Sequence, residues 1–288
     1  MKRFLFLVCS LVSVVAVAAV TPDVAKANKQ TATSQPKQTT AKHKPTADIQ
    51  KLTAAQIVDK NVAARGGLKA WRAVNTLTLS GQMEAGGKKN TALPFVMKME
   101  RPRMSRLEIR FQDQTAVQVY DGEHGWKLRP FLGRSEVEPF TPAEAKAAET
   151  WAELDGPLVD YARKGSKVAL LGTESVEGNN TYKLKLTLKN GEERHVWVDA
   201  ASFLERKIDG DPRKMDGKLH NVAVYYRDYK TVNGLTLPHV LETIVEGDKR
   251  SQPHKLYIRQ MMVNQPLEDK LFAKPQLAMA SVSGSKAE

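Results

Sequence analysis

Cysteine is nearly missing from this chain. Its 288 residues include one cysteine, Cys9, which lies in an apolar run near the N-terminus. If that run is removed as a signal peptide, no cysteine remains. A disulfide framework, a thiol nucleophile and a thiolate metal site are then excluded. The folded part must therefore be stabilised by its hydrophobic core.

Sequence signatures of catalysis are missing as well. The chain has no Gly-x-Ser-x-Gly, Gly-x-Gly-x-x-Gly or His-Glu-x-x-His motif and no phosphate-binding loop. Glu193 and His195 come shortly after an Asn-Gly turn, which favours a solvated strand start over an acid-base pair. The histidines are scattered without the spacing of metal ligands: His43, His124, His195, His220, His239 and His254. We therefore expect neither an enzyme nor a bound metal ion or cofactor.

One long apolar run is present, and it indicates export. Residues 1–3 are Met-Lys-Arg, residues 4–20 are almost entirely apolar, and residues 25–27 are Ala-Lys-Ala. A positive start, an apolar centre and small residues before the cleavage site are typical of a signal peptide. We expect residues 1–27 to be this signal, cleavage near Ala27, and a periplasmic location. The alternative is an uncleaved membrane anchor, because about 17 apolar residues are close to the minimum for a bilayer span.

Polar segments flank a single predicted domain. Residues 28–47 are rich in Thr, Gln, Lys and Pro and contain no acidic residue. Such a segment buries too little apolar surface to fold, so we expect a disordered tether. Its lysines predict a weak attraction to anionic membrane surfaces. The domain itself is predicted at residues 48–275, and residues 276–288 are predicted to form a flexible tail.

Strand-like alternation dominates the predicted domain. Residues 181–189 alternate between apolar even-numbered positions and polar odd-numbered positions. A period of two with one apolar face is typical of an antiparallel sheet that has one solvated face. We expect five strands before the second helix and about six after it. Hairpin turns are predicted at Gly86-Gly87, Asp121-Gly122, Asn190-Gly191, Asp209-Gly210 and Asn233-Gly234.

Two helical stretches are predicted to cover this sheet. The first spans about residues 54–74, and Gly66-Gly67 is expected to interrupt it, because each glycine costs about 1 kcal/mol relative to alanine. The second begins at Thr141-Pro142, which opens a capping box completed by Glu144. A short helix is expected to resume at residues 158–164. The predicted fold is mainly β with α (α+β), a curved antiparallel sheet with helices across its inner face.

The order and spacing of these motifs resemble the LolA-like lipoprotein-sorting family. In that family too an Arg-Pro, here Arg101-Pro102, follows a strand, and an Asp-Gly turn leads to a tryptophan, here Trp126. Further similar segments are residues 64–68, 79–81, 98–103, 119–126, 156–161 and 228–238. The resemblance implies an incomplete β-barrel closed by a helical lid. It also implies an apolar cavity that holds the acyl chains of a lipoprotein during transfer across the periplasm.

The predicted inner face supplies a candidate cavity lining. Methionine suits such a lining because it is unbranched and polarizable and can repack around flexible chains. The alternative is that the same side chains fill an ordinary core and leave no cavity. The candidate lining residues are Leu77, Leu79, Phe95, Met97, Met99, Leu107, Ile109, Val117, Val119, Trp126, Trp151 and Leu158.

Arg101 is the candidate for holding the lid. In the family that the chain resembles, an arginine at this position forms hydrogen bonds to the lid helices and keeps the cavity shut. The planar guanidinium suits this role because it can reach several carbonyl groups at once. Arg103 and Arg106 are alternatives for the role, and Arg101 could also be an exposed residue at a strand end.

The predicted function is therefore that of a periplasmic carrier without catalytic activity. Its expected partners are the acyl chains of lipoproteins or other lipids, and membrane-bound donor and acceptor proteins. The alternative is an envelope-stress sensor or a scaffold on the same fold, which would bind proteins at the edges or outer face of the sheet. Nucleic-acid binding is not indicated, because part of the formal net charge of +12 lies in the tether.

Overall fold

The computed structural model describes residues 51–84, 92–130, 133–215, 218–247 and 252–276, with residues 213–215 described by their backbone. The predicted signal peptide, the predicted tether and residues 277–288 of the predicted tail lie outside the described residues. The predicted turn at Gly86-Gly87 lies outside them too. None of the helices in the described ranges is both long enough and apolar enough to cross a membrane.

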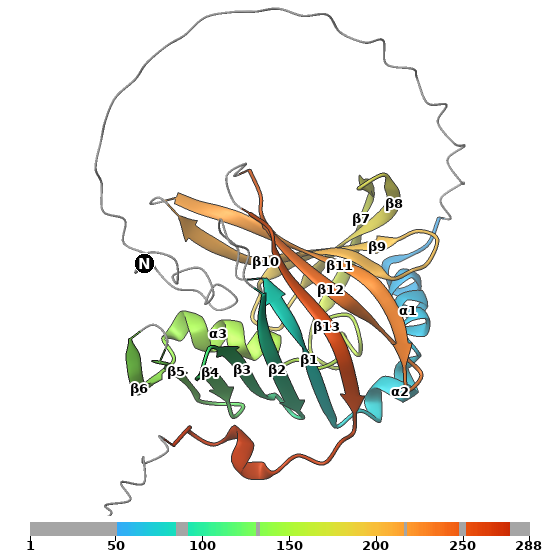
Figure 1. Ribbon diagram of the computed structural model, residues 1–288. Helices are drawn as coiled ribbons and strands as arrows, with labels where there is room; N and C mark the ends of the chain where they lie inside the picture. The colour runs from blue at the N-terminus through green and yellow to red at the C-terminus, as the bar shows by residue number, and fades with distance from the viewer. Residues whose placement is uncertain (1–50, 85–91, 131–132, 216–217, 248–251, 277–288) are drawn as a thin grey trace, which may run out of the picture.

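The described residues form one open antiparallel sheet (Figure 1). Its strands follow the order β6-β5-β4-β3-β2-β1-β13-β12-β11-β10-β9-β8-β7. The predicted curved sheet is confirmed. The strands are β1 (Thr76–Glu84), β2 (Ala92–Glu100), β3 (Met104–Phe111), β4 (Gln114–Tyr120), β5 (Gly125–Arg129), β6 (Arg134–Pro139), β7 (Lys167–Val176), β8 (Asn179–Thr187), β9 (Glu193–Asp199), β10 (Glu205–Met215), β11 (Lys218–Val232), β12 (Leu235–Val245) and β13 (His254–Val263).

The strand order determines where the cover of the sheet must lie. Strands β1–β6 and β7–β13 are two meanders, joined where β1 pairs with β13. Consequently β6 and β7, which follow one another in the chain, form opposite edges of the sheet. Residues 140–166 connect these two edges. They contain helix α3 (Pro142–Trp151), which packs against one face of the sheet (Figure 1); we call this the inner face.

The helices begin and end where the sequence indicates. Thr53 and Gln56 form a capping box at the start of α1 (Ala54–Ala64), and α2 (Leu68–Arg72) follows after the two glycines. Gly66 has a φ of 111°, and a Cβ at this position would lie 2.3 Å from the carbonyl oxygen of Gly234. The predicted interruption is therefore confirmed, with close backbone contact as its cause. The capping box of α3 is also confirmed.

Two predictions about local structure are wrong. Residues 158–164 form successive turns instead of a helix. Asp160 has a φ of 53° there, and its carboxylate accepts two hydrogen bonds from Arg72. Asp209-Gly210 lies inside β10 and is not a hairpin turn. The strand continues through the glycine, and the register of its pairing with β11 shifts just after Gly210. There are also six described strands before α3 and seven after it.

The main core lies on the inner face. Leu184 and Leu186 of β8 are fully buried there, while Lys183 and Lys185 alternate with them on the outer face. This alternation is the one that residues 181–189 predict. Helices α1 and α2 add Ile57 and Trp71 to the same core. A long sheet with only short helices on it thus buries one face in preference to the other.

Three predicted lining residues, Val117, Val119 and Trp126, lie on the outer face. The two-residue turn after β3 pairs Leu107 with Gln118, so odd-numbered residues of β3 share a face with even-numbered residues of β4. Val119 pairs with Trp126 and points away from Leu107 as a result. The three side chains pack under the 3-10 helix η2 (Asp269–Phe272), where Phe272 is 2% exposed. Their assignment to the inner face is therefore wrong.

Helix α3 is attached to the inner face by a buried ion pair. Lys127 of β5 donates a hydrogen bond to Glu144 in the first turn of α3, and both side chains are buried. Burial opposes ionisation of Glu144, but hydrogen bonds from Lys127 and from the backbone of Thr141 outweigh it and hold the pKa of this carboxyl group below its ordinary value. The pair therefore requires an ionised Glu144.

Glu144→Gln tests this attachment, because glutamine preserves the capping box and removes the charge. We expect a loss of about 3–5 kcal/mol in the free energy of unfolding at pH 7, since Lys127 is then a buried charge without its main partner. The lowered pKa means that the wild-type advantage is complete above about pH 4.3, the ordinary value for glutamate, and is lost as the pH falls through the lower folded-state pKa. Urea unfolding of both proteins at several pH values measures this difference.

The control is Glu149→Gln on the same helix, because Glu149 is exposed and its partner Arg103 is exposed as well. This variant should stay within about 0.5 kcal/mol of the wild type at every pH. A difference between Glu144→Gln and wild type that stays constant or grows toward acidic pH would contradict the assignment.

Candidate functional site

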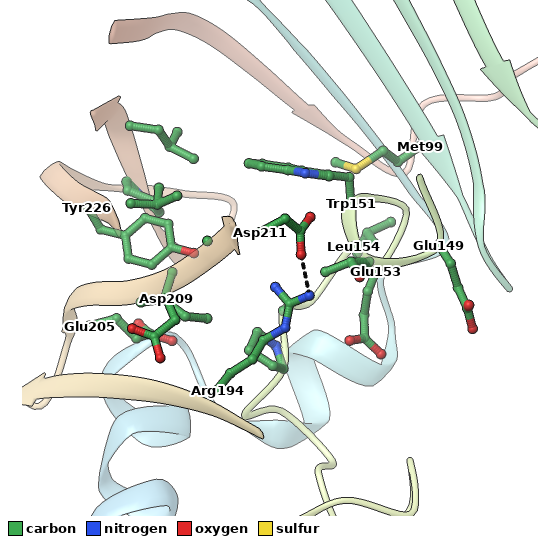
Figure 2. A pocket seen from close by; sticks show the side chains of 18 of the residues that line it. Met99, Glu149, Trp151, Glu153, Leu154, Arg194, Glu205, Asp209, Asp211 and Tyr226 are labelled. Atoms are coloured by element: carbon green, nitrogen blue, oxygen red, sulfur yellow. Dashed lines mark hydrogen bonds and ion pairs between the residues drawn. The ribbon is translucent and has the colours of Figure 1, made fainter. Parts of the chain in front are cut away.

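A cavity of about 600 Å³ lies between the inner face and the segment that connects β6 to β7. Its floor comes from both meanders of the sheet, and its cover comes from α3 and residues 152–157. Figure 2 shows Trp151 and Leu154 of the cover facing the strands, with Met99 beside them. The volume is within the range of about 300–1,000 Å³ that is usual for small-molecule sites.

Five of the predicted lining residues line this cavity: Leu77, Leu79, Met97, Met99 and Trp151. Phe95, Ile109 and Leu158 are buried in the main core, and Leu107 packs against that core from the inner face. These four side chains support the walls without being part of the lining. Whether the lining residues contact a ligand stays a prediction.

The second meander supplies lining residues that the sequence reasoning missed. Ile208 of β10, Val222 and Val224 of β11, Leu241 of β12 and Ile258 of β13 lie opposite the predicted set. The apolar and aromatic run at residues 222–226 was the signal that could have revealed this strand, although a run without alternation does not indicate which side chains face the cavity. These strands join the site because β13 pairs with β1, which brings the last strand of the chain beside the first.

The polar residues around the cavity are arranged in ion pairs. Six cationic and six acidic residues line it. Five of the six cations pair with acids of the same lining: Arg65 with Glu205, Arg103 with Glu149, Lys146 with Glu192, Lys164 with Glu153 and Arg194 with Asp211. Figure 2 shows the last of these pairs. The cavity therefore combines an apolar floor with polar walls whose charges largely cancel.

Asp155 in the cover holds three cationic side chains. Its carboxylate, 4% exposed, accepts hydrogen bonds from Arg101 Nη2 at 2.8 Å and from Lys164 Nζ at 2.6 Å. Its backbone carbonyl accepts a third from Arg65 Nη1 at 3.1 Å. Charge-assisted hydrogen bonds of this kind are stronger than neutral ones. Asp155 thus joins the cover to the end of α1 and to the corner after β2.

Arg101 also reaches the chain after α2. Its Nε donates to the carbonyl of Val74 at 2.7 Å, and its Nη2 donates to the carbonyl of Trp71 at 3.1 Å. Of the two alternatives, Arg103 pairs with exposed Glu149 on α3, and Arg106 lies on the outer face, where it donates to the carbonyl of Leu271. Arg101 is therefore the arginine of the three that touches the buried part of the cover. Its role in opening stays a prediction.

One end of the cavity is polar and hydrogen-bonded. Arg65 stacks on the ring of Trp71 at 4.5 Å and donates to Glu205 at 3.1 Å. The hydroxyl of Tyr229 donates to the other carboxylate oxygen of Glu205 at 3.2 Å. Burial, followed by the negative charge of Glu205, raises the pKa of both Tyr226 and Tyr229. These hydroxyls therefore remain protonated donors at ordinary pH.

Among the described residues, no three His, Cys, Asp or Glu side chains are placed to hold a metal ion. His195 contacts Asp209 at 2.7 Å and tilts against Trp197, which places it in a surface contact next to one edge of the site. The arrangement can enclose an apolar ligand and can hold its cover closed by polar contacts.

Comparison by sequence gives little information. A family described only as an uncharacterized protein matches residues 160–279. No curated protein matches the chain in sequence.

Comparison by structure is informative about the fold. A LolA superfamily protein from Nitrosomonas europaea shares 16% identity at a TM-score of 0.51, over 77% of this chain and 98% of the other. An outer membrane lipoprotein-sorting protein domain from Vibrio parahaemolyticus shares 13% sequence identity at a TM-score of 0.50, over 77% of this chain and 96% of that domain. A DUF1329 family protein from Desulfovibrio piger shares 14% sequence identity at a TM-score of 0.53, over 76% of this chain and 97% of the other. The chain therefore has the LolA-like fold, an open antiparallel sheet under a helical cover.

Proposed function

We propose that this protein is a carrier that holds acyl chains of lipids or of lipid-modified proteins in its covered cavity. The observation that supports the proposal most directly is the apolar floor of a cavity of about 600 Å³ beneath a cover fastened by polar contacts. The structurally similar domain from Vibrio parahaemolyticus is described as an outer membrane lipoprotein-sorting protein domain. The proposed role here is binding and transfer, with no chemical step.

The energetics of burial support this role. Each methylene group removed from water contributes about 0.8 kcal/mol, so a 16-carbon chain gains about 12 kcal/mol as an upper bound. Association itself costs about 4–15 kcal/mol. A net gain therefore depends on a site that is already formed before binding. The cavity between the sheet and α3 meets this condition, because it is open without rearrangement of the strands.

The proposed location is the periplasm. The pattern of residues 1–27 supports export, since it combines a positive start, an apolar centre and a small-residue cleavage site. A carrier in this compartment would take its cargo from one membrane-bound partner and deliver it to another. The basic segment at residues 28–47 would add a weak attraction to anionic membrane surfaces.

A second candidate function is a sensor or scaffold that binds another protein. It is favoured by the edge strand β7, in which Leu170 is 36% and Leu171 51% exposed. Unpaired strand edges can accept a strand from a partner. The titration below separates the two candidates, because a scaffold does not require lipid.

Titration with a fluorescent fatty-acyl probe tests the carrier proposal. The wild-type protein should bind the probe saturably, and Met97→Trp should weaken binding by about tenfold or more, because the larger side chain fills the cavity floor. Val96→Trp is the matched control, since Val96 is the neighbouring residue on the outer face, where it pairs with Ser80 and Glu108. The control should bind as the wild type does. No saturable binding by the folded wild-type protein would refute the carrier proposal and favour the scaffold.

Arg101→Leu tests whether the contacts of Arg101 hold the cover closed. A bulky cargo such as a triacylated lipopeptide can enter only if the cover lifts, and the contacts to Asp155, Trp71 and Val74 oppose this. Removing them should tighten binding of the lipopeptide by roughly tenfold and slow its release, because the open state then costs less.

Arg110→Leu is the control for this experiment, because Arg110 is an exposed arginine on β3. It should leave lipopeptide affinity unchanged. Equal or weaker affinity in Arg101→Leu than in the wild type would return Arg101 to a purely structural role.

A further inference from the structure

The cavity is large enough for a long acyl chain. A methylene group is about the size of a water molecule, which needs about 10–15 Å³ of such a cavity. The volume of about 600 Å³ therefore has room for at least one chain of 16–18 carbons.

The charges of the lining disfavour an ionised headgroup. Five of the six lining cations already pair with lining acids. The sixth cation, Lys189, is exposed, and the sixth acid, Asp209, accepts from His195. A fatty-acid carboxylate drawn into the cavity would find no buried cation without a partner among the described residues. Burying an unpaired charge costs several kcal/mol.

Tyr226 offers a hydrogen-bond donor inside the cavity. Tyr226 lines the cavity, and no described residue accepts a hydrogen bond from its hydroxyl or donates one to it. Figure 2 shows this hydroxyl directed into the cavity, on the same side as Glu205 and Asp209. The nearby Glu205 already accepts from Arg65 and Tyr229. Tyr226 is therefore a donor without an acceptor at one end of the apolar floor.

We infer that the cavity binds a long acyl chain with an uncharged ester or amide headgroup, whose carbonyl oxygen accepts a hydrogen bond from Tyr226. The chain then lies along the floor of the sheet toward Met99 and Trp151, which are apolar and lie across the cavity from Tyr226 (Figure 2). The inference rests on the proposed carrier function and adds to it the class of ligand. A monoacylglycerol or an N-acyl amide has this chemistry.

The raised pKa of Tyr226 is consistent with this role, because a hydroxyl that stays protonated can always donate. A neighbouring carboxylate would repel a negatively charged headgroup but not a neutral carbonyl group. The hydrogen bond contributes discrimination between headgroups, and the buried chain contributes most of the affinity.

The test compares two lipids that share one chain and differ in the headgroup, 1-monooleoylglycerol and oleate. Displacement of the fluorescent acyl probe from the purified protein gives the affinity of each below its aggregation concentration. We expect monooleoylglycerol to bind about tenfold or more tightly than oleate at pH 7.

Tyr226→Phe should weaken monooleoylglycerol binding by about threefold to tenfold, the usual value of one neutral hydrogen bond, and leave oleate binding unchanged. Tyr225→Phe is the matched control, because Tyr225 is the next residue of β11 and its ring faces Lys207 and Arg227 outside the cavity. This control should bind both lipids as the wild type does. A general loss of stability in Tyr226→Phe would weaken both lipids equally, so the ratio of the two affinities is the decisive readout.

Oleate bound as tightly as monooleoylglycerol, or an unchanged ratio in Tyr226→Phe, would overturn the inference while the carrier proposal stands. Failure of the acyl probe and of both lipids to bind would instead remove the carrier proposal, and the inference with it.

Discussion

The covered cavity depends on Asp155. This buried carboxylate and its backbone carbonyl receive hydrogen bonds from Arg101, Lys164 and Arg65, which come from three separate parts of the chain. A buried carboxylate is stable only when cations and donors surround it. The cover of the cavity is therefore fixed to the sheet by polar contacts at a few points, while the surface beneath it stays apolar. Buried apolar side chains of the same segment, such as Leu154 and Ala152, add to these contacts.

The topology explains why there is space below that cover. The two edge strands, β6 and β7, are consecutive in the chain, so one connecting segment has to cross the inner face of the whole sheet. Helix α3 is attached near one edge by Lys127 and Glu144, and α1 fills the region near β7. The floor between them is covered by the end of α3 and the short segment 152–157, which leaves the volume open. A filled core would need a longer or bulkier connection.

The sequence predicted the fold more accurately than the site. Dipeptides such as Asn190-Gly191 and Asn233-Gly234 mark their turns because few residues adopt the required backbone angles, and the capping box at Thr141 marks α3 for a similarly local reason. The face of a strand depends on pairing register, which local patterns do not contain. Val117, Val119 and Trp126 were therefore placed on the wrong face, and the contribution of β10–β13 to the lining was missed. Tyr226 could not be recognised as a free donor from sequence, because its partners depend on residues far away in the chain.

The central claim is that a lipid chain lies on the inner face, between the sheet and its cover. Photo-crosslinking with an acyl chain that carries a diazirine near its end, followed by peptide mapping, tests this most directly. The account predicts labelling of residues such as Met97, Met99 and Trp151, and loss of labelling when unmodified lipid is added. Labelling confined to the outer face, or to the exposed edge at Leu170 and Leu171, would contradict it.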